Sequence, residues 1–185
     1  MWIGARPSFP LRLVRMPPIP SALEAELLSV FGADEDPIAE VEARARLFFP
    51  HTPLIVWEGD PTTFAFTYVG GDAEAMLGFS TRDWIDGPTF WADHVIHPDD
   101  RADAIAYCAL ATGRKADHVF EYRAITKGQD IVWLRDYVRV VLGPRNVPVR
   151  LRGLMFDVSE EKWAARASAK AALLRRPTAT ELGVA

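Results

Sequence analysis

Cysteine, excess charge and long apolar runs are all scarce in this sequence, and each shortage narrows what the protein can be. Cys108 is the only cysteine among 185 residues, so no internal disulfide can form, which suits a reducing compartment. No apolar run reaches the length of about 18 residues that a membrane span needs. Residues 1–20 also lack the apolar core of a signal peptide. We therefore expect a cytoplasmic protein without a membrane partner.

The charge balance argues against nucleic acid as a partner. A formal charge of −4 lacks the basic excess of a dedicated duplex-binding protein. Hydrophobic residues make up 49% of the chain and charged residues 25%, which is typical of a packed globular domain rather than of a disordered or coiled-coil chain. The length suits one domain with appendages.

Two amphipathic helices are predicted near the N-terminus, after a proline-rich start. Residues 1–20 contain five prolines, and we expect them to form an extended or disordered tail. Apolar residues then recur at helical spacing over residues 21–31 and 38–49, with Asp36 as the expected N-cap of the second helix. Because each helix must bury one face, residues 21–52 are predicted to form either a cap on the next domain or a dimerisation segment.

Beyond residue 53 the pattern changes to short strands and one longer helix. β-Branched and aromatic residues predict strands at 54–57 and 63–69, joined by a turn. Glycine and proline divide residues 72–91 into short helical turns. A longer helix is predicted over residues 98–112, because proline and two aspartates favour its first turn and a glycine follows its end.

The C-terminal part of the chain predicts an antiparallel meander of three strands joined by short turns. The strands cover residues 119–126, 131–142 and 147–158. Alternation gives one nearly apolar face and one arginine-rich face, on which Trp133 and Tyr137 are expected to anchor the N-terminal helices or a partner subunit. Together with Leu27 and Val41, these two residues are the expected dimer contacts.

Asp136 is the one ionisable side chain that alternation places on the apolar face of the meander. An unpaired charge would be costly there, so two interpretations remain. The favoured one is a bulge or a strand edge that turns the carboxyl group outward. The other is a contact between Asp136 and a ligand.

Six local strings resemble a Per-Arnt-Sim (PAS) sensor domain, in particular its PAS fold-3 subgroup, in order and spacing. They are Tyr68-Val69, Leu77-Gly78-Phe79-Ser80, Ile96-His97-Pro98-Asp99-Asp100-Arg101, Glu121-Tyr122-Arg123, Val132-Trp133-Leu134 and Gly153-Leu154-Met155-Phe156-Asp157-Val158-Ser159-Glu160-Glu161-Lys162. The resemblance implies an α+β fold, in which helices on one face of a five-stranded antiparallel sheet enclose a small pocket. It also implies a PAS domain over residues 53–158, a signalling helix over 159–176 and a tail over 177–185.

The resemblance further implies a bacterial, non-catalytic sensor that forms a homodimer. The last strand passes through Asp157 and Ser159 directly into a helix that begins at Glu160, with Ser159 as its expected cap. A small shift of the sheet would therefore reorient that helix. We expect the signal to reach a partner such as a histidine kinase or a cyclase domain, as in two-component systems.

A pocket, if it is open, should select small apolar or aromatic ligands. Its expected lining is Trp57, Phe66, Trp91, Ile105, Cys108, Phe120, Tyr122, Leu134 and Met155. The alternative is a filled core that binds no ligand. We expect neither haem nor flavin, because residues 99–112 contain no histidine and the Asn-Cys-Arg string of flavin-binding light sensors in this superfamily is missing.

Two further hypotheses concern metal and catalysis. His94 and His97 could supply two metal ligands, but the sequence places no cysteine, aspartate or glutamate constellation beside them, so we expect no metal site. The competing enzymatic hypothesis is a small cavity enzyme of the ketosteroid-isomerase type. In such an enzyme Asp136 would act as the base and Tyr122 as the proton donor.

Overall fold

A five-stranded antiparallel sheet forms the centre of the molecule, with the strand order β2-β1-β5-β4-β3. The structure is a computed structural model and describes residues 21–174, so the predicted tails, 1–20 and 177–185, lie outside the described residues. The strands are β1 Leu54–Gly59, β2 Phe66–Gly71, β3 His118–Ile125, β4 Ile131–Gly143 and β5 Val147–Asp157. The predicted α+β architecture is confirmed.

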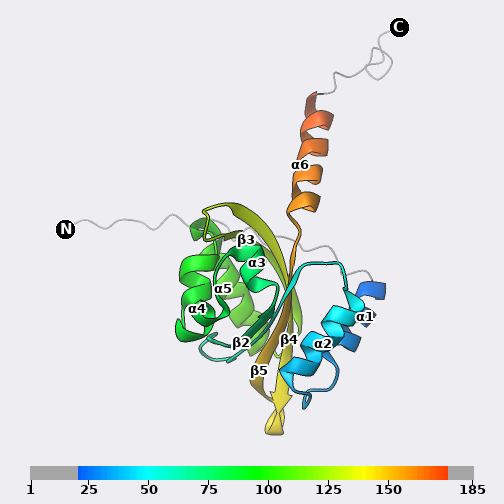
Figure 1. Cartoon of the computed structure of the whole chain (residues 1–185). Helices are drawn as coiled ribbons and strands as arrows, with labels where there is room; N and C mark the ends of the chain where they lie inside the picture. The colour runs from blue at the N-terminus through cyan, green and yellow to red at the C-terminus, as the bar shows by residue number, and fades with distance from the viewer. Residues whose placement is uncertain (1–20, 175–185) are drawn as a thin grey trace, which may run out of the picture.

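Helices cover both faces of the sheet (Figure 1). They are α1 Ser21–Phe31, α2 Ile38–Phe48, α3 Ala73–Leu77, α4 Thr81–Asp86, the π-helix η1 Trp91–Val95, α5 Pro98–Gly113, the 3₁₀-helix η2 Pro144–Asn146 and α6 Ser159–Leu174. One face carries α3, α4 and α5, the other carries α1 and α2, and α6 projects away from the body (Figure 1). No helix in the described part of the chain has the length and apolar character of a membrane span.

The longest helix on the sheet, α5, begins where the sequence predicts it. Pro98 occupies the first turn, where the missing N–H costs no hydrogen bond. Asp99 and Asp100 place negative charge at the positive end of the helix dipole. The ring nitrogen Nδ1 of His97 accepts the Asp99 N–H at 3.3 Å and so caps the helix. Local signals are therefore sufficient to fix the start of α5.

The start of α2 corrects one prediction. Asp36 does not cap this helix, because Pro37 occupies the N-cap position without a side-chain hydrogen bond. The Asp36 carboxylate instead accepts the backbone N–H of Ala33 at 3.1 Å and pairs with Arg44 at 2.9 Å. It therefore stabilises the connection between α1 and α2 rather than the first turn of α2.

The N-terminal helices pack on the sheet of their own chain, as the predicted cap would. Leu27 and Val41 are 4% and 0% exposed, and Tyr137 of β4 is 5% exposed in the same apolar cluster. These three predicted dimer contacts are already covered within one protomer. A second copy of the chain would have to contact other residues of these helices.

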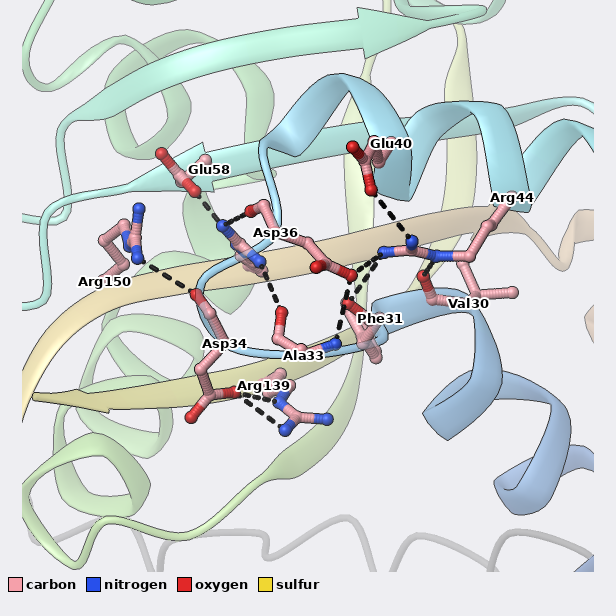
Figure 2. Close-up of polar contacts among 11 residues, drawn as sticks. Val30, Phe31, Ala33, Asp34, Asp36, Glu40, Arg44, Glu58, Arg139 and Arg150 are labelled. Carbon is pink, nitrogen blue, oxygen red and sulfur yellow. Dashed lines mark hydrogen bonds and ion pairs between the residues drawn. The ribbon is translucent and has the colours of Figure 1, made fainter.

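Arginines hold the connection between α1 and α2 against the sheet (Figure 2). Arg139 donates to the Asp34 carboxylate at 3.0 and 2.8 Å, and Arg150 donates to the Asp34 carbonyl at 3.0 Å. Arg44 of α2 donates to the Val30 carbonyl at 2.8 Å. The arginine-rich face that alternation predicts is thus in large part covered by the N-terminal helices.

Candidate functional site

A cavity lies on the face of the sheet opposite to α1 and α2, beneath η1 and α5. Its empty volume is about 290 Å³ with open solvent included, but the space that the centre of a water molecule can occupy is only about 10 Å³, which is room for about one water molecule. The residues that line it are Trp57, Gly59, Asp60, Phe64, Phe66, Trp91, Cys108, Phe120, Asp136 and Leu151. The core beneath the helices is therefore nearly filled, and only a small group fits inside.

The structure brings part of the predicted lining to this cavity. The predicted residues that line it are Trp57, Phe66, Trp91, Cys108 and Phe120. The predicted residues that pack in or against the surrounding apolar core instead are Ile105, Tyr122, Leu134 and Met155. The open space therefore lies close to β1 and to the residues that follow it, whereas alternation alone predicts a pocket centred on the C-terminal strands.

The mouth of the cavity contains residues that sequence reasoning missed. The sequence predicts a strand at Phe64, yet this residue adopts the left-handed conformation with φ +59° and precedes β2. The turn before it is closed by Asp60, whose Oδ1 accepts the N–H groups of Thr62 and Thr63 at 2.8 and 2.7 Å. The sequence does contain a signal for this turn. An aspartate side chain often accepts hydrogen bonds from the backbone N–H groups two and three residues later, as Asp60 does here.

Trp57 crosses the sheet inside the cavity because Gly153 leaves room for its ring. The two residues are direct partners on β1 and β5, and a Cβ atom on Gly153 would lie 2.1 Å from the indole. The ring can therefore reach over β5 to β4. There its Nε1 donates a hydrogen bond to Oδ1 of Asp136 at 3.0 Å.

The position of Asp136 shows that the favoured prediction, an outward-turned carboxyl group, is wrong. Strand β4 stays in register here, since Asp136 pairs with Phe120 on one side and Met155 on the other. The only register shift of this strand against β5 lies between Val141 and Leu142. Asp136 is 1% exposed, and burial raises its pKa to about 8 although the bond from Trp57 opposes this. The carboxyl group is therefore mostly protonated at pH 7.

Two other titratable groups lie near Asp136. Burial is the main cause that raises the pKa of the Cys108 thiol to about 12, so this thiol stays protonated and unreactive. Burial also raises the pKa of Tyr122 well above its ordinary value. The Tyr122 hydroxyl accepts from Nε1 of Trp91 at 3.0 Å and contacts Sδ of Met155 at 3.6 Å. Tyr122 does not line the cavity. Of the two groups that the enzymatic hypothesis needs, only Asp136 therefore lies at the cavity.

The connection between β5 and α6 is tied to the beginning of β4. The backbone N–H of Val158 donates to the Trp133 carbonyl at 2.8 Å, and the Trp133 N–H donates to the Ser159 hydroxyl at 2.8 Å. The Ser159 N–H in turn donates to Oδ1 of Asp157 at 2.8 Å. Ser159 is therefore not the expected cap, because its hydroxyl binds β4 and Asp157 accepts the N–H at the start of the helix. Glu160 is exposed in the first turn.

Ion pairs reinforce this junction. Arg135 of β4 pairs with Glu121 of β3 at 2.8 Å and with Glu161 of α6 at 2.9 Å. Lys162 also pairs with Glu121, and its ammonium group lies 5.2 Å from the centroid of the Trp133 ring. The first turns of α6 are thereby held to the two strands β3 and β4.

The histidine pair does not form a metal centre with other residues. His97 caps α5, and the ring of His94 lies 5.1 Å from that of Phe90. Within residues 21–174, no group of three or more histidine, cysteine or acidic side chains could hold a metal ion.

Comparisons with known proteins agree with this fold. A family model described as PAS fold matches residues 66–155. The N-terminal domain of a diguanylate cyclase with PAS/PAC sensor from Marinobacter aquaeolei is 34% identical, with a TM-score of 0.55 over 59% of this chain and 98% of that one. A search of curated proteins found no match.

More distant structures share the fold. A sensory box histidine kinase/response regulator from Burkholderia thailandensis is 23% identical, with a TM-score of 0.57 over 69% of this chain and 94% of that one. The PAS domain of a Colwellia psychrerythraea protein is 18% identical, with a TM-score of 0.53 over 67% and 99%. With the family model and the Marinobacter domain, the sheet order and the junction into α6 lead to one conclusion: the chain belongs to the PAS family.

Proposed function

We propose that this PAS domain is a non-catalytic sensory module in which occupation of the cavity changes the direction of α6. The observation that carries the proposal is the position of both ends of this pathway on one strand. Asp136 lines the cavity, and Trp133, three residues earlier on β4, holds the β5–α6 junction through two hydrogen bonds, one to the Val158 backbone and one to the Ser159 hydroxyl. A shift of β4 at the cavity is thereby coupled to the base of α6.

The geometry of α6 amplifies such a shift. The helix has 16 residues and projects from the body (Figure 1). Such a helix is about 24 Å long, so a tilt of about 10° at its base displaces its far end by about 4 Å. The output partner that we propose is a kinase or cyclase domain, since the similar structures come from a diguanylate cyclase and a histidine kinase.

A homodimer is part of this proposal. Apolar side chains remain exposed on the outer sides of α1 and α2, where Leu28 is 52%, Leu47 79% and Phe48 45% exposed. On α6 Trp163 is 48% exposed. These residues, rather than the buried ones named from the sequence, would contact a second copy. We place the dimer in the bacterial cytoplasm, where the reduced state of Cys108 is maintained.

The experiment uses the charge of Asp136 as the input, because it needs no knowledge of the ligand. Spin labels are attached at Lys127→Cys and Ala171→Cys, two exposed positions, while Cys108 stays unlabelled because it is buried. Electron–electron double resonance then measures the distance between the labels at pH 6.5 and pH 9. We expect a shift of about 3 Å or more, its loss in Asp136→Asn and its reduction in Ser159→Ala.

A matched control uses Glu160→Gln, which removes a charge from the first turn of α6 without touching the junction bonds. This variant should keep the full pH response. An unchanged distance in the parent protein, while Asp136 is shown by infrared spectroscopy to ionise, would contradict the proposed coupling.

A further inference from the structure

The walls of the cavity combine aromatic rings with carboxyl groups. The rings are Trp57, Phe64, Phe66, Trp91 and Phe120. Neighbouring rings pack edge to face, at 62° between Trp57 and Phe66 and 84° between Trp91 and Phe120. Asp136 and Asp60 also line the cavity, with Gly59, Cys108 and Leu151, and no lysine, arginine or histidine belongs to the lining.

The two carboxyl groups occupy different depths. Asp136 is 1% exposed, and its Oδ1 accepts from Trp57. No donor in the described part of the chain reaches Oδ2, although the residue lines the cavity. Asp60 is partly exposed at the mouth, and the N–H groups of Thr63 and Thr62 lower its pKa, so it stays ionised. Oδ2 is not among the fully buried polar atoms that lack a partner, so a small ligand in the cavity can donate a hydrogen bond to it.

We propose that the cavity binds the head group of a small primary ammonium ion, with its alkyl or aryl substituent lying in the mouth beside Asp60 and Phe64. This inference rests on the sensory function proposed for the same cavity. An ammonium group is about the size of the one water molecule for which the cavity has room. It donates hydrogen bonds to Oδ2 of Asp136, and the faces of the surrounding rings attract its charge.

Other ligand classes fit this lining less well. An anion would meet two carboxyl groups and no basic side chain. A purely apolar molecule would leave Oδ2 of Asp136 without a donor. A quaternary ammonium ion carries the right charge, but it has no N–H group and is larger than the one water molecule for which the cavity has room.

The proposal includes a direction for the effect of pH. Asp136 is mostly protonated at pH 7, because burial raises its pKa to about 8, and a bound cation favours the ionised form. Binding therefore releases a proton, and the affinity should rise about tenfold per pH unit below 8 and level off above it. The titratable groups that face Asp136 are Cys108 on α5 and Tyr122 on β3, which stay protonated, and Asp60, which stays ionised across this range.

The test compares four probes by isothermal titration calorimetry on the whole chain at pH 6.5, 7.5 and 8.5. n-Butylamine is the cation and resembles a lysine side chain, whose pKa of about 10.4 keeps it charged throughout. n-Butanol is the neutral analogue, butyrate the anionic one and tetramethylammonium the larger cation. We expect n-butylamine to bind at least tenfold more tightly than the other three at pH 8.5.

Two variants locate the interaction. Asp136→Asn should weaken n-butylamine binding at least tenfold at pH 8.5 and flatten its pH profile, while binding of n-butanol stays unchanged. Asp60→Asn should weaken it about two- to threefold, and only at low salt, because this partly exposed carboxylate is screened. If Asp136→Asn does not fold, the pH profile of the parent protein decides, and a flat profile overturns the proposal.

Equal binding of n-butanol and n-butylamine, tighter binding of butyrate, or no binding of n-butylamine at pH 8.5 also overturns it. None of these results affects the sensory proposal, which depends on the movement of α6 with the charge of Asp136. The converse holds as well. Binding of n-butylamine without any movement of α6 would support the ligand class and contradict the sensory coupling.

Discussion

At the scale of single residues, the cavity depends on the pair formed by Trp57 and Gly153. A side chain at position 153 would overlap the indole ring, since a Cβ atom would approach it to 2.1 Å. We expect Gly153→Ala to lower the free energy of unfolding by at least about 2 kcal/mol, because the ring must move and Asp136 loses its buried donor. Urea denaturation measures this change.

Gly113→Ala is the matched control for that substitution. No heavy atom lies within 4 Å of a Cβ atom built at Gly113, which ends α5. This variant should be neutral or up to about 1 kcal/mol more stable, because alanine favours a helix over glycine. Equal effects of the two alanines would show that Trp57 does not depend on Gly153.

The second residue-scale prediction concerns Asp136 and the pH dependence of stability. Burial raises its pKa from 3.8 in the unfolded chain to about 8 in the folded one. Folding therefore favours the protonated carboxyl group. The contribution of Asp136 to the free energy of unfolding is highest below pH 4 and decreases as the pH rises towards 8. Asp136→Asn removes this loss. The stability of the variant relative to the parent should therefore rise by up to about 1.4 kcal/mol per pH unit between pH 5 and 8.

The measurement is a series of urea melts of both proteins across this range. Burial lowers the pKa of His118, so this group destabilises the fold at acid pH, but it does so in both proteins and cancels in the difference. A constant difference between parent and variant from pH 5 to pH 8 would mean that Asp136 titrates normally.

At the scale of elements, the β5–α6 junction depends on one buried carboxylate. The Glu121 side chain is 1% exposed and pairs with both Arg135 and Lys162. Glu121→Gln should loosen the first turns of α6 and lower the free energy of unfolding by about 1 to 3 kcal/mol. Hydrogen exchange of the amides after Ser159 should rise, whereas Glu160→Gln should leave it unchanged.

The elements themselves could be predicted from the sequence where their signals are local. Helix α5 begins at Pro98 and ends at Gly113, close to the predicted limits, because the residues that favour its start and its end lie within the helix itself. The three C-terminal strands were predicted in the same way, from alternation and short turns. Phe64 was missed because its positive φ follows from the turn before it rather than from its own preference for strands.

Long-range pairs could not be predicted in this way. Alternation places Asp136 on the apolar face, but it does not reveal that Trp57, 79 positions earlier in the chain, donates a hydrogen bond to the carboxyl group there. Local signals likewise do not reveal that the Ser159 hydroxyl binds β4 at Trp133 instead of capping α6. The residues that decide the site are therefore those whose partners lie far away in sequence.

At the scale of the whole molecule, one buried arginine joins the N-terminal helices to the sheet. Arg152 of β5 is 1% exposed and donates to the Glu58 carboxylate at 2.9 Å. It also donates to the carbonyls of Ala33, at 3.4 Å, and Asp36 in the connection between α1 and α2. These bonds fix the position of the helices that cover one face of the sheet.

Arg152→Leu should detach that connection. The variant leaves Glu58 and two carbonyl groups without a donor, and we expect it to lower the free energy of unfolding by about 3 kcal/mol or more. Hydrogen exchange should rise first in α1 and α2, while the amides of β3 and β4 stay protected. The control is Arg82→Leu, which removes an exposed pair with Asp86 and should change stability by less than about 0.5 kcal/mol. If both variants lose the same stability, Arg152 does not contribute to holding the N-terminal helices on the sheet.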